Sequence, residues 1–367
     1  MSMLQKIITS GATPTYMSTW YWADTLFSAQ ITAGNRTKIT SPASIQVDVG
    51  GVSLTQYSAQ TIDIAVASNW DDYAGDSDWD STNYSTAANR AGLDFYLYAV
   101  APVEGSIPRL LVSANSTCPI GYATNTSRKI AGFHCLCADA GTISGHTLTG
   151  YVTGDILPAT VWDLKHKSAA TYGNIGQFYE PSYQEWWGIY PLSGTLSAPT
   201  ILKGGTILSG TGVDWNGAVD AAAVLGMRLP KDANFQVAAA GSNEETNIVS
   251  SAQPSPFTSI GYSDTAGRRM ISNLGMESAC GLIYQWLDEQ AMRWEFTTSW
   301  NWYDLPGGKG SLFNGAGAAG TGDVKLFAGG SWSLGTNCGS RCRRLDYPRG
   351  GVWSSFGVRV VARSLER

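Results

Sequence analysis

The sequence predicts an α+β fold, in which an N-terminal β-sandwich-like domain precedes a domain of two helices and a loop-rich β region. Three observations carry this prediction. Apolar and polar residues alternate in the first half, as over 44–66. The helical patterns, at 215–230 and 231–241, come only in the second half. The 367 residues include 42 glycines and 14 tryptophans, which favours turns and short strands over long helices.

The first half reads as a series of short strands. The stretch 44–66 alternates on both sides of a Gly-Gly pair, which is a hairpin signal. The stretches 93–102 and 128–139 continue the same pattern. A mixed, proline-containing stretch over 153–173 ends it. We therefore expect a β-rich domain at 38–168.

The second half, 169–367, starts a different pattern. The alanine-rich stretch 215–230 is closed by a proline, and the helix expected over 231–241 is closed by a glycine. The following stretches, 281–289 and 293–304, contain strand and loop signals only. A second domain that mixes helices and strands follows from this order.

Composition excludes several classes of partner. Charged residues make up only 14% of the chain, against a usual share of about 25%. The net charge is −5 and no basic stripe lies outside the last 40 residues, so nucleic acid is not expected as a partner. No apolar run approaches the ~20 residues of a membrane helix, so no membrane insertion is expected. The start, MSMLQKIITSGATP, has no signal-peptide pattern, so we expect synthesis in a cytosol.

Cysteines and acidic residues offer weak metal-site candidates. Cys135 and Cys137 follow a histidine, but the C-x-C spacing favours buried thiols over a metal site. Cys338 and Cys342 are interpreted as scaffold thiols, with a redox pair as the alternative. The three aspartates that imitate the start of a calcium loop are Asp76, Asp78 and Asp80. That loop lacks the expected glycine and the final glutamate, so a solvated loop is favoured, structural calcium is the alternative, and no other cofactor is expected.

Several motifs resemble those of formylglycine-generating-enzyme-like domains, which have a C-type lectin fold. The stretch RLPKDANFQVAAAG (228–241) is similar to a helix of these domains. GLIYQWLDE (281–289) is similar to their G-x-x-W-E-W turn. GGSW and RVVARS, at the end of the chain, are similar to their closing strand pair. The resemblance implies a C-type lectin fold for the ligand-binding domain at 169–367.

A longer resemblance, over about 40–364, is to the major-tropism-determinant family of retroelement-diversified phage receptor-binding proteins. It rests on IGYATNTSRKIAGFH (120–134), VWDLKHKSAA (161–170) and GMRLPKDANFQ (226–236), and on LFAGGSW and GSR…FGVR near the end. The resemblance implies a homotrimer at a phage tail fibre tip. Its implied partners are other virion tail proteins and a host cell-surface protein or glycan. The family's extra β-prism is lacking or replaced within 1–37, which we assign to attachment or trimerisation.

In this family, mutagenesis directed at adenines rewrites chosen asparagine codons of a variable region, which corresponds here to 326–364. Carried over position by position, the variable face comprises Ser331, Ser333, Leu334, Asn337, Arg344, Asp346, Tyr347, Gly351 and Ser355. Trp353 also aligns with a variable position, but TGG cannot arise from an asparagine codon through its adenines alone. Trp353 is therefore either fixed or a sign of a different template. Arg349 joins the ligand-binding face because arginine, like tryptophan and tyrosine, dominates binding hot spots.

A variable face needs a fixed frame beneath it. Trp286, Trp300 and Trp332 are predicted to supply large apolar anchors, each with an indole N–H for the backbone. Arg341 and Arg359 are predicted to lock the frame by forking onto carbonyls or carboxylates, with ligand contact as the alternative role. The aromatic run EWWGIY (185–190) is expected to lie in a surface that associates with other copies.

Two other functional classes compete with receptor binding. A formylglycine-generating-enzyme-like oxidase holds copper with two cysteines just after its GGS block, but here the comparable early position is Leu334. All three histidines lie before residue 170 and offer no persuasive Ser-His-Asp set. A calcium-dependent glycan-binding lectin would need acidic-proline and Trp-Asn-Asp motifs, to which WNW (300–302) comes nearest. The sequence therefore predicts a receptor-binding protein and not an enzyme.

Overall fold

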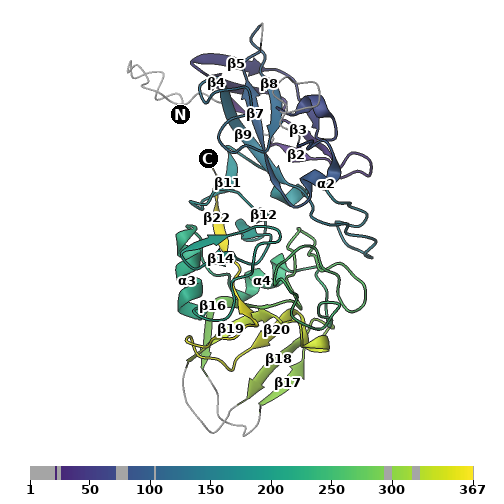
Figure 1. Cartoon of the computed structure of the whole chain (residues 1–367), viewed down its shortest axis with the longest axis vertical. Helices are drawn as coiled ribbons and strands as arrows, with labels where there is room; N and C mark the ends of the chain where they lie inside the picture. Colours follow the sequence, from purple (N-terminus) through teal and green to yellow (C-terminus); the bar gives the residue numbers. More distant parts are fainter. Residues whose placement is uncertain are drawn as a thin grey trace, which may run out of the picture.

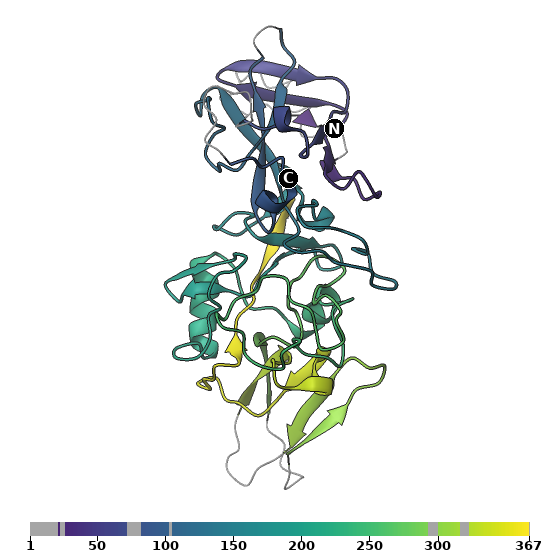
Figure 2. The ribbon, with the colours of Figure 1, turned by 45° about the vertical axis from the view of Figure 1, so that its right-hand side comes forward.

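The computed structural model describes residues 21–22, 26–71, 82–102, 105–292, 300–315 and 323–366. The molecule is elongated, with the N-terminal strands at one end and a six-stranded sheet at the other (Figure 1). The last strand, β22 (Val361–Glu366), lies between the two ends of the molecule (Figure 2). It pairs with β11 (His166–Ser168) on one side and with β13 (Glu185–Gly188) on the other, so the end of the chain ties the two halves together.

The N-terminal half contains the predicted hairpin. Strands β4 (Ile45–Val49) and β5 (Val52–Gln56) pair in antiparallel register through Val49 and Val52. The Gly50–Gly51 turn between them has φ values of +64° and +82°, a conformation that favours glycine at both positions. The hairpin prediction is confirmed by this strand pairing. It could be made from the sequence because the Gly-Gly pair specifies the turn locally.

Three sheets make up this half. The hairpin forms the first sheet with β1 (Tyr21–Trp22). The second consists of β2 (Ser28–Ala29), β3 (Lys38–Thr40) and β6 (Thr61–Asp63). The third, in spatial order, consists of β10 (Trp162–Asp163), β9 (Ser127–His134), β7 (Asp94–Val100) and β8 (Arg109–Ser113). Two short helical segments, η1 (Ala67–Asn69) and α2 (Ala87–Arg90), connect them.

A single hydrophobic core joins these sheets. Trp70 is 1% exposed, and its indole N–H donates to the carbonyl of Ile64 at 2.9 Å. The Trp70 ring stands edge-on to Phe95, with 5.0 Å between the centroids. Cys135 is also fully buried in this core, and Cys137 is buried in the core of the second half. The interpretation of these two residues as buried thiols is therefore confirmed.

The second half contains both predicted helices, α3 (Trp215–Val224) and α4 (Asp232–Ala238). Asp214 caps α3 by accepting a hydrogen bond from the amide of Gly217 at 2.8 Å. Strands β12 (Gln177–Glu180), β14 (Ser193–Thr195) and β15 (Ala198–Thr200), and the short helix η2 (Pro158–Thr160), complete the region beside β13. With three α-helices among the described residues, the fold is mostly β.

The six-stranded sheet has the spatial order β17-β18-β20-β19-β16-β21. Its strands are β16 (Tyr284–Met292), β17 (Trp300–Asp304), β18 (Ser311–Gly315), β19 (Asp323–Gly329), β20 (Gly339–Arg344) and β21 (Phe356–Gly357). The pairs β18–β20 and β16–β21 are parallel, and the other neighbours are antiparallel. This order places the β17–β18 hairpin directly beside β20, in the predicted variable region.

The expectation for EWWGIY (185–190) is wrong. Trp186, Trp187 and Ile189 are fully buried, and Tyr190 is 1% exposed. The reason is that β13 is an inner strand of the sheet β11-β22-β13-β12, so its aromatic side chains fill the core of the chain itself. An aromatic run in an inner strand needs no second copy to cover it.

Candidate functional site

The predicted variable stretch runs from the end of β19 through the short helix η3 (Gly335–Asn337), along β20 and through a loop to β21. Three of the predicted site residues are exposed: Ser333, Arg349 and Trp353. Seven are half-buried: Leu334, Asn337, Arg344, Asp346, Tyr347, Gly351 and Ser355. Most of the predicted site residues are thus at least partly exposed, some before β20 and the others after it.

Ser331 does not join this face. It is 3% exposed, and its carbonyl accepts a hydrogen bond from the Cys338 thiol. The chain turns inward here because Gly329 and Gly330 have φ values of +89° and +85°. A Cβ on either glycine would collide with Ala279 or Cys338. The assignment of Ser331 to the ligand-binding face is therefore wrong.

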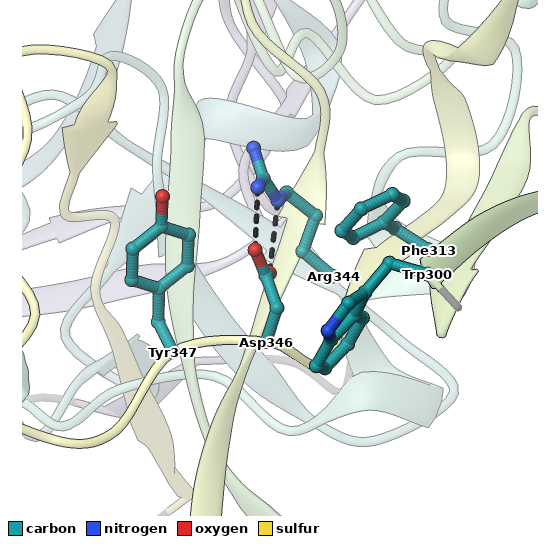
Figure 3. Close-up of a pocket in the computed structure, with 5 residues that line it drawn as sticks. All are labelled: Trp300, Phe313, Arg344, Asp346 and Tyr347. Atoms are coloured by element: carbon teal, nitrogen blue, oxygen red, sulfur yellow. Dashed lines mark hydrogen bonds and ion pairs between the residues drawn. The ribbon is translucent and has the colours of Figure 1, made fainter. Parts of the chain in front are cut away.

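A pocket of about 390 Å³ opens beside the end of β20. Its lining residues are Trp300, Phe313, Arg344, Asp346 and Tyr347. Tyr347 lies on one side, Trp300 and Phe313 lie on the other, and the Arg344 and Asp346 side chains lie between them (Figure 3). Three of the five come from the predicted variable stretch and two from the neighbouring hairpin.

Arg344 and Asp346 form a two-pronged ion pair at the centre of the pocket. The Arg344 Nε donates to Asp346 Oδ1 at 2.9 Å, and Nη2 donates to Oδ2 at 2.5 Å. The two side chains are 20% and 12% exposed, so the pair is only partly screened by water. Burial alone would lower the pKa of Arg344, but the hydrogen bonds to Asp346 raise it above its ordinary value. The guanidinium therefore stays charged and its charge is balanced within the pocket.

Aromatic rings hold the guanidinium in place. The Arg344 Cζ lies 5.0 Å from the centroid of Phe313 and 5.1 Å from that of Tyr347, within the range of cation–π attraction. The Tyr347 ring in turn stands edge-on to Phe356, 4.8 Å away, in the hydrophobic core. Tyr347 therefore both lines the pocket and packs against the core.

The β17–β18 hairpin supplies the remaining wall. Trp300 and Phe313 stack with 5.5 Å between their centroids and 19° between their planes. Phe313 also pairs with Arg344 in the parallel β18–β20 register, which fixes it beside the ion pair. The sequence singled out Trp300 as an anchor, and the structure places it in the pocket wall. Phe313 was missed, because nothing local in SLFNG indicates a parallel partner far along the chain.

The predicted scaffold arginines differ from each other. Arg359 is fully buried and donates to the carbonyls of Gly188, Ile189 and Glu277, each at 2.7 Å. It also donates to the side-chain oxygen of Gln285 at 2.5 Å. Burial lowers the pKa of Arg359 to about 9, so the group is still charged at neutral pH.

Arg341 does not have the scaffold geometry predicted for it. Its side chain is exposed and donates to the amide oxygen of Gln236 at 3.2 Å. The arginine of β20 that turns inward is Arg343, which is 4% exposed, pairs with Asp232 and lies 5.3 Å from the Phe235 ring. The sequence reading missed Arg343, and the acidic start of α4 is the signal that could have indicated it.

The predicted tryptophan anchors lie under the face. Trp286 is fully buried, and its indole N–H donates to the carbonyl of Val213 at 3.1 Å. Trp332 is half-buried, with its ring edge-on to Phe257 at 5.3 Å. Both residues therefore contact the hydrophobic cores beneath the variable stretch.

Cys338 and Cys342 belong to no metal-binding group in the described part of the chain. Cys338 and Cys342 are free and fully buried, and burial raises the pKa of the Cys342 thiol to about 12. The pKa of Cys338 is also raised well above its usual value by burial. Asp76, Asp78 and Asp80 lie outside the described residues. Among the residues described, no group of three or more His, Cys, Asp or Glu is placed to hold a metal, and no helix is long and apolar enough to cross a membrane.

Known proteins share this architecture. A family model for the second domain of Mtd matches residues 30–163. The tail fiber receptor-binding protein of Bordetella phage BPP-1 is 25% identical over 300 residues, covering 76% of this chain and 73% of that protein.

Solved structures of Major Tropism Determinant variants have a similar fold. The U1 variant of the Major Tropism Determinant has a TM-score of 0.70 at 21% identity and covers 95% of this chain and 87% of its own. The P3c variant has a TM-score of 0.68 at 21% identity, with the same coverage. A mostly β fold with few helices is consistent with the C-type lectin-like fold that the sequence resemblance implied. The chain is therefore similar to phage tropism determinants in sequence over much of its length and in fold.

Proposed function

We propose that this chain is the receptor-binding protein of a phage tail fibre and that the face around the Arg344–Asp346 pair binds the host cell surface. The relative from Bordetella phage BPP-1 is named for receptor binding on a tail fiber, which supports the proposal. The structural observation that carries it is the pocket, in which Arg344, Asp346 and Tyr347 of the predicted variable stretch converge. Tyrosine, tryptophan and arginine in a partly desolvated pocket are typical of binding hot spots.

The proposal extends to the rest of the chain. We assign residues 38–168 to a β-sandwich-like domain that carries the binding domain, 169–367, away from the tail. Residues 1–37 attach the protein to other virion tail proteins or hold the trimer together. The protein is then a virion component, synthesised in the bacterial cytoplasm, with a host cell-surface protein or glycan as its receptor.

The receptor-binding role has a direct test in a double variant. Arg344→Ala with Tyr347→Ala should abolish binding to host cells, because the two changes remove the central ion pair and one wall of the pocket. The measurement is the binding of purified, fluorescently labelled protein to host cells by flow cytometry. Arg109→Ala with Tyr57→Ala provides a control matched in residue type, because both residues are exposed in the N-terminal half. Undiminished binding by the Arg344/Tyr347 variant would contradict the proposal.

We also propose a homotrimer with its three binding faces directed the same way. The aromatic run 185–190 no longer supports association, because it is buried within the chain. The support comes from function, since a single rewritten face that binds weakly gains roughly 10²–10⁴ in avidity when several faces act together. Light scattering should give a mass near three times the 39.1 kDa of the chain. A monomer at micromolar concentration would show that the trimer proposal is wrong.

No enzymatic role and no catalytic metal are proposed. The thiolate is the form that ligates copper, and burial keeps Cys338 and Cys342 protonated at neutral pH. We therefore expect elemental analysis of protein purified without chelator to show no stoichiometric copper or zinc. Stoichiometric copper that is lost in Cys338→Ser would instead favour the oxidase. Stoichiometric calcium in the same analysis would support a structural calcium ion at the loop around Asp78, whose sequence resembles the start of a calcium-binding loop. It would also favour the calcium-dependent lectin alternative.

A further inference from the structure

We propose that the pocket beside β20 binds a neutral pyranose ring of a host surface glycan, with Trp300 as the platform on which the ring stacks. This inference rests on the proposed receptor-binding function and names the class of ligand. It assigns a binding role to Trp300 and Phe313, which both lie outside the predicted variable region, 326–364.

The shape of the pocket suits a small flat ring. Trp300 and Phe313 form a stacked wall, with 19° between their planes, and Tyr347 faces them from the other side (Figure 3). The volume of about 390 Å³ lies at the lower end of the range for small-molecule sites, which is roughly 300–1,000 Å³. A sugar ring has an apolar C–H face that can lie on an aromatic ring while its edge stays polar. The aromatic wall of the pocket can cover the apolar face of the sugar, and the polar centre of the pocket can bind its polar edge.

The charges of the pocket favour a neutral ligand. Arg344 and Asp346 balance each other, and the guanidinium already lies against the faces of Phe313 and Tyr347. A cationic ligand would meet the Arg344 charge where it approached the rings, and an anionic ligand would meet the Asp346 carboxylate. Hydroxyl groups fit both members of the pair, because a carboxylate accepts from a hydroxyl and a guanidinium donates to one.

The same ion pair argues against an apolar protein side chain as the ligand. A leucine or phenylalanine side chain would cover the Arg344–Asp346 pair and exclude water without offering hydrogen bonds in return. Polar groups that lose water and gain no partner lower the affinity. A sugar edge that carries hydroxyl groups avoids that loss while its C–H face still covers the Trp300 ring. The chemistry of the pocket therefore fits a glycan better than a protein side chain.

The walls of the pocket come from two different segments of the chain. Trp300 and Phe313 come from the β17–β18 hairpin, whereas Arg344, Asp346 and Tyr347 come from the predicted variable stretch. Codon rewriting within 326–364 would change the polar centre and one wall, and would leave the stacking platform unchanged. Variants of this protein would then keep an affinity for sugar rings and change which arrangement of hydroxyl groups they prefer.

Saturation-transfer NMR on the full-length protein tests the inference. The probes are the methyl glycosides of glucose, galactose and mannose, each at about 10 mM, because single sugar rings bind weakly. N-acetylneuraminic acid is the anionic probe, the N-acetyl methylamide of lysine is the cationic probe, and N-acetylphenylalanine amide represents an apolar side chain. At least one neutral glycoside should receive saturation, and Trp300→Ala should weaken its binding by about tenfold or more.

Two further variants separate stacking from folding. Trp300→Phe retains an aromatic platform and should keep most of the affinity. Tyr303→Ala removes an exposed aromatic side chain from the same strand, outside the pocket lining, and should leave sugar binding within about twofold of the unmodified protein. Equal loss of binding in Tyr303→Ala and Trp300→Ala would overturn the platform role of Trp300.

The outcomes also separate this inference from the proposed function. Saturation of the phenylalanine, lysine or anionic probe with no neutral glycoside bound would overturn the inference, as would a result in which no probe is bound. Host cells provide the second readout, because periodate destroys surface glycans and protease removes surface proteins. Binding to cells that survives periodate but is lost after protease treatment would overturn the glycan ligand while leaving the receptor-binding role intact. The absence of any binding to untreated host cells would instead contradict the receptor-binding role itself.

Discussion

Replacing Trp286 by alanine should lower the free energy of unfolding by about 3–5 kcal/mol, as truncation of a buried aromatic side chain does. Trp286 is fully buried, and its ring lies 3.8 Å from Phe327 and 5.6 Å from Phe356, measured between centroids. Its indole N–H also donates to the carbonyl of Val213, which would be left without this donor. The variant would therefore combine a cavity with a lost buried hydrogen bond, and denaturant unfolding measures the sum.

Trp353→Ala is the matched control for this experiment. Trp353 is 54% exposed on the loop before β21, so its truncation should change the free energy of unfolding by no more than about 0.5 kcal/mol. Equal destabilisation by the two tryptophan variants would show that the core beneath the variable stretch does not centre on Trp286.

Elements with a local cause could be predicted from the sequence. The Gly50–Gly51 turn needs two positive φ values, and the paired glycines announce it. Helix α3 has an alanine-rich interior, and both helices have a proline or glycine beyond their ends, so their existence followed from the sequence alone. Trp286 could be recognised as core because it lies within an apolar run.

The candidate site depends on pairings that no local pattern encodes. The pocket wall exists because Phe313 of β18 lies parallel to Arg344 of β20, and the sequence of neither strand indicates this partner. Ser331 was misplaced because the inward turn at Gly329 and Gly330 is a response to the close approach of Ala279 and Cys338. The burial of Ser331 and the position of Phe313 depend on neighbouring strands, so they could be recognised only in the folded structure.

The local sequence also does not distinguish the two arginines Arg341 and Arg343. Arg341 and Arg343 lie two residues apart in β20, so a strict alternation would give them the same environment. Yet Arg341 is exposed and Arg343 is buried against Asp232. Both side chains reach α4, but Arg343 packs on the Phe235 ring and pairs with Asp232, whereas Arg341 contacts Gln236 at the surface. Tertiary packing therefore decides which arginine belongs to the frame.

The frame around the predicted variable face includes buried hydrogen bonds as well as hydrophobic packing. Arg359 follows β21 and reaches backbone carbonyls at the end of β13 and at Glu277. These bonds connect segments that are far apart in the sequence. Because the bonds go mainly to backbone atoms, they hold the chain path whatever side chains the face displays.

Arg359→Met should therefore lower the free energy of unfolding by about 3–5 kcal/mol, because several buried hydrogen bonds from one charged donor are lost together. Three carbonyls and the Gln285 side-chain oxygen would lose the hydrogen bond from Arg359 inside the core. Arg359→Lys should be nearly as damaging, because a single ammonium group cannot reproduce the planar fork that reaches all four acceptors. Denaturant unfolding of both variants measures the effect.

Arg341→Met provides the control, since it makes the same substitution at an exposed arginine of the predicted variable region. Its effect should stay within about 0.5 kcal/mol, as should that of Ser333→Ala on the exposed face. Arg359→Met protein that unfolds like these two variants would mean that the buried guanidinium does not hold the frame. A large loss of unfolding free energy in both Arg359 variants, with none in the Arg341 or Ser333 variants, would support the opposite conclusion. The residues that stabilise the domain would then differ from those displayed on the predicted variable face. A face built in this way can exchange its side chains without unfolding the domain that displays them.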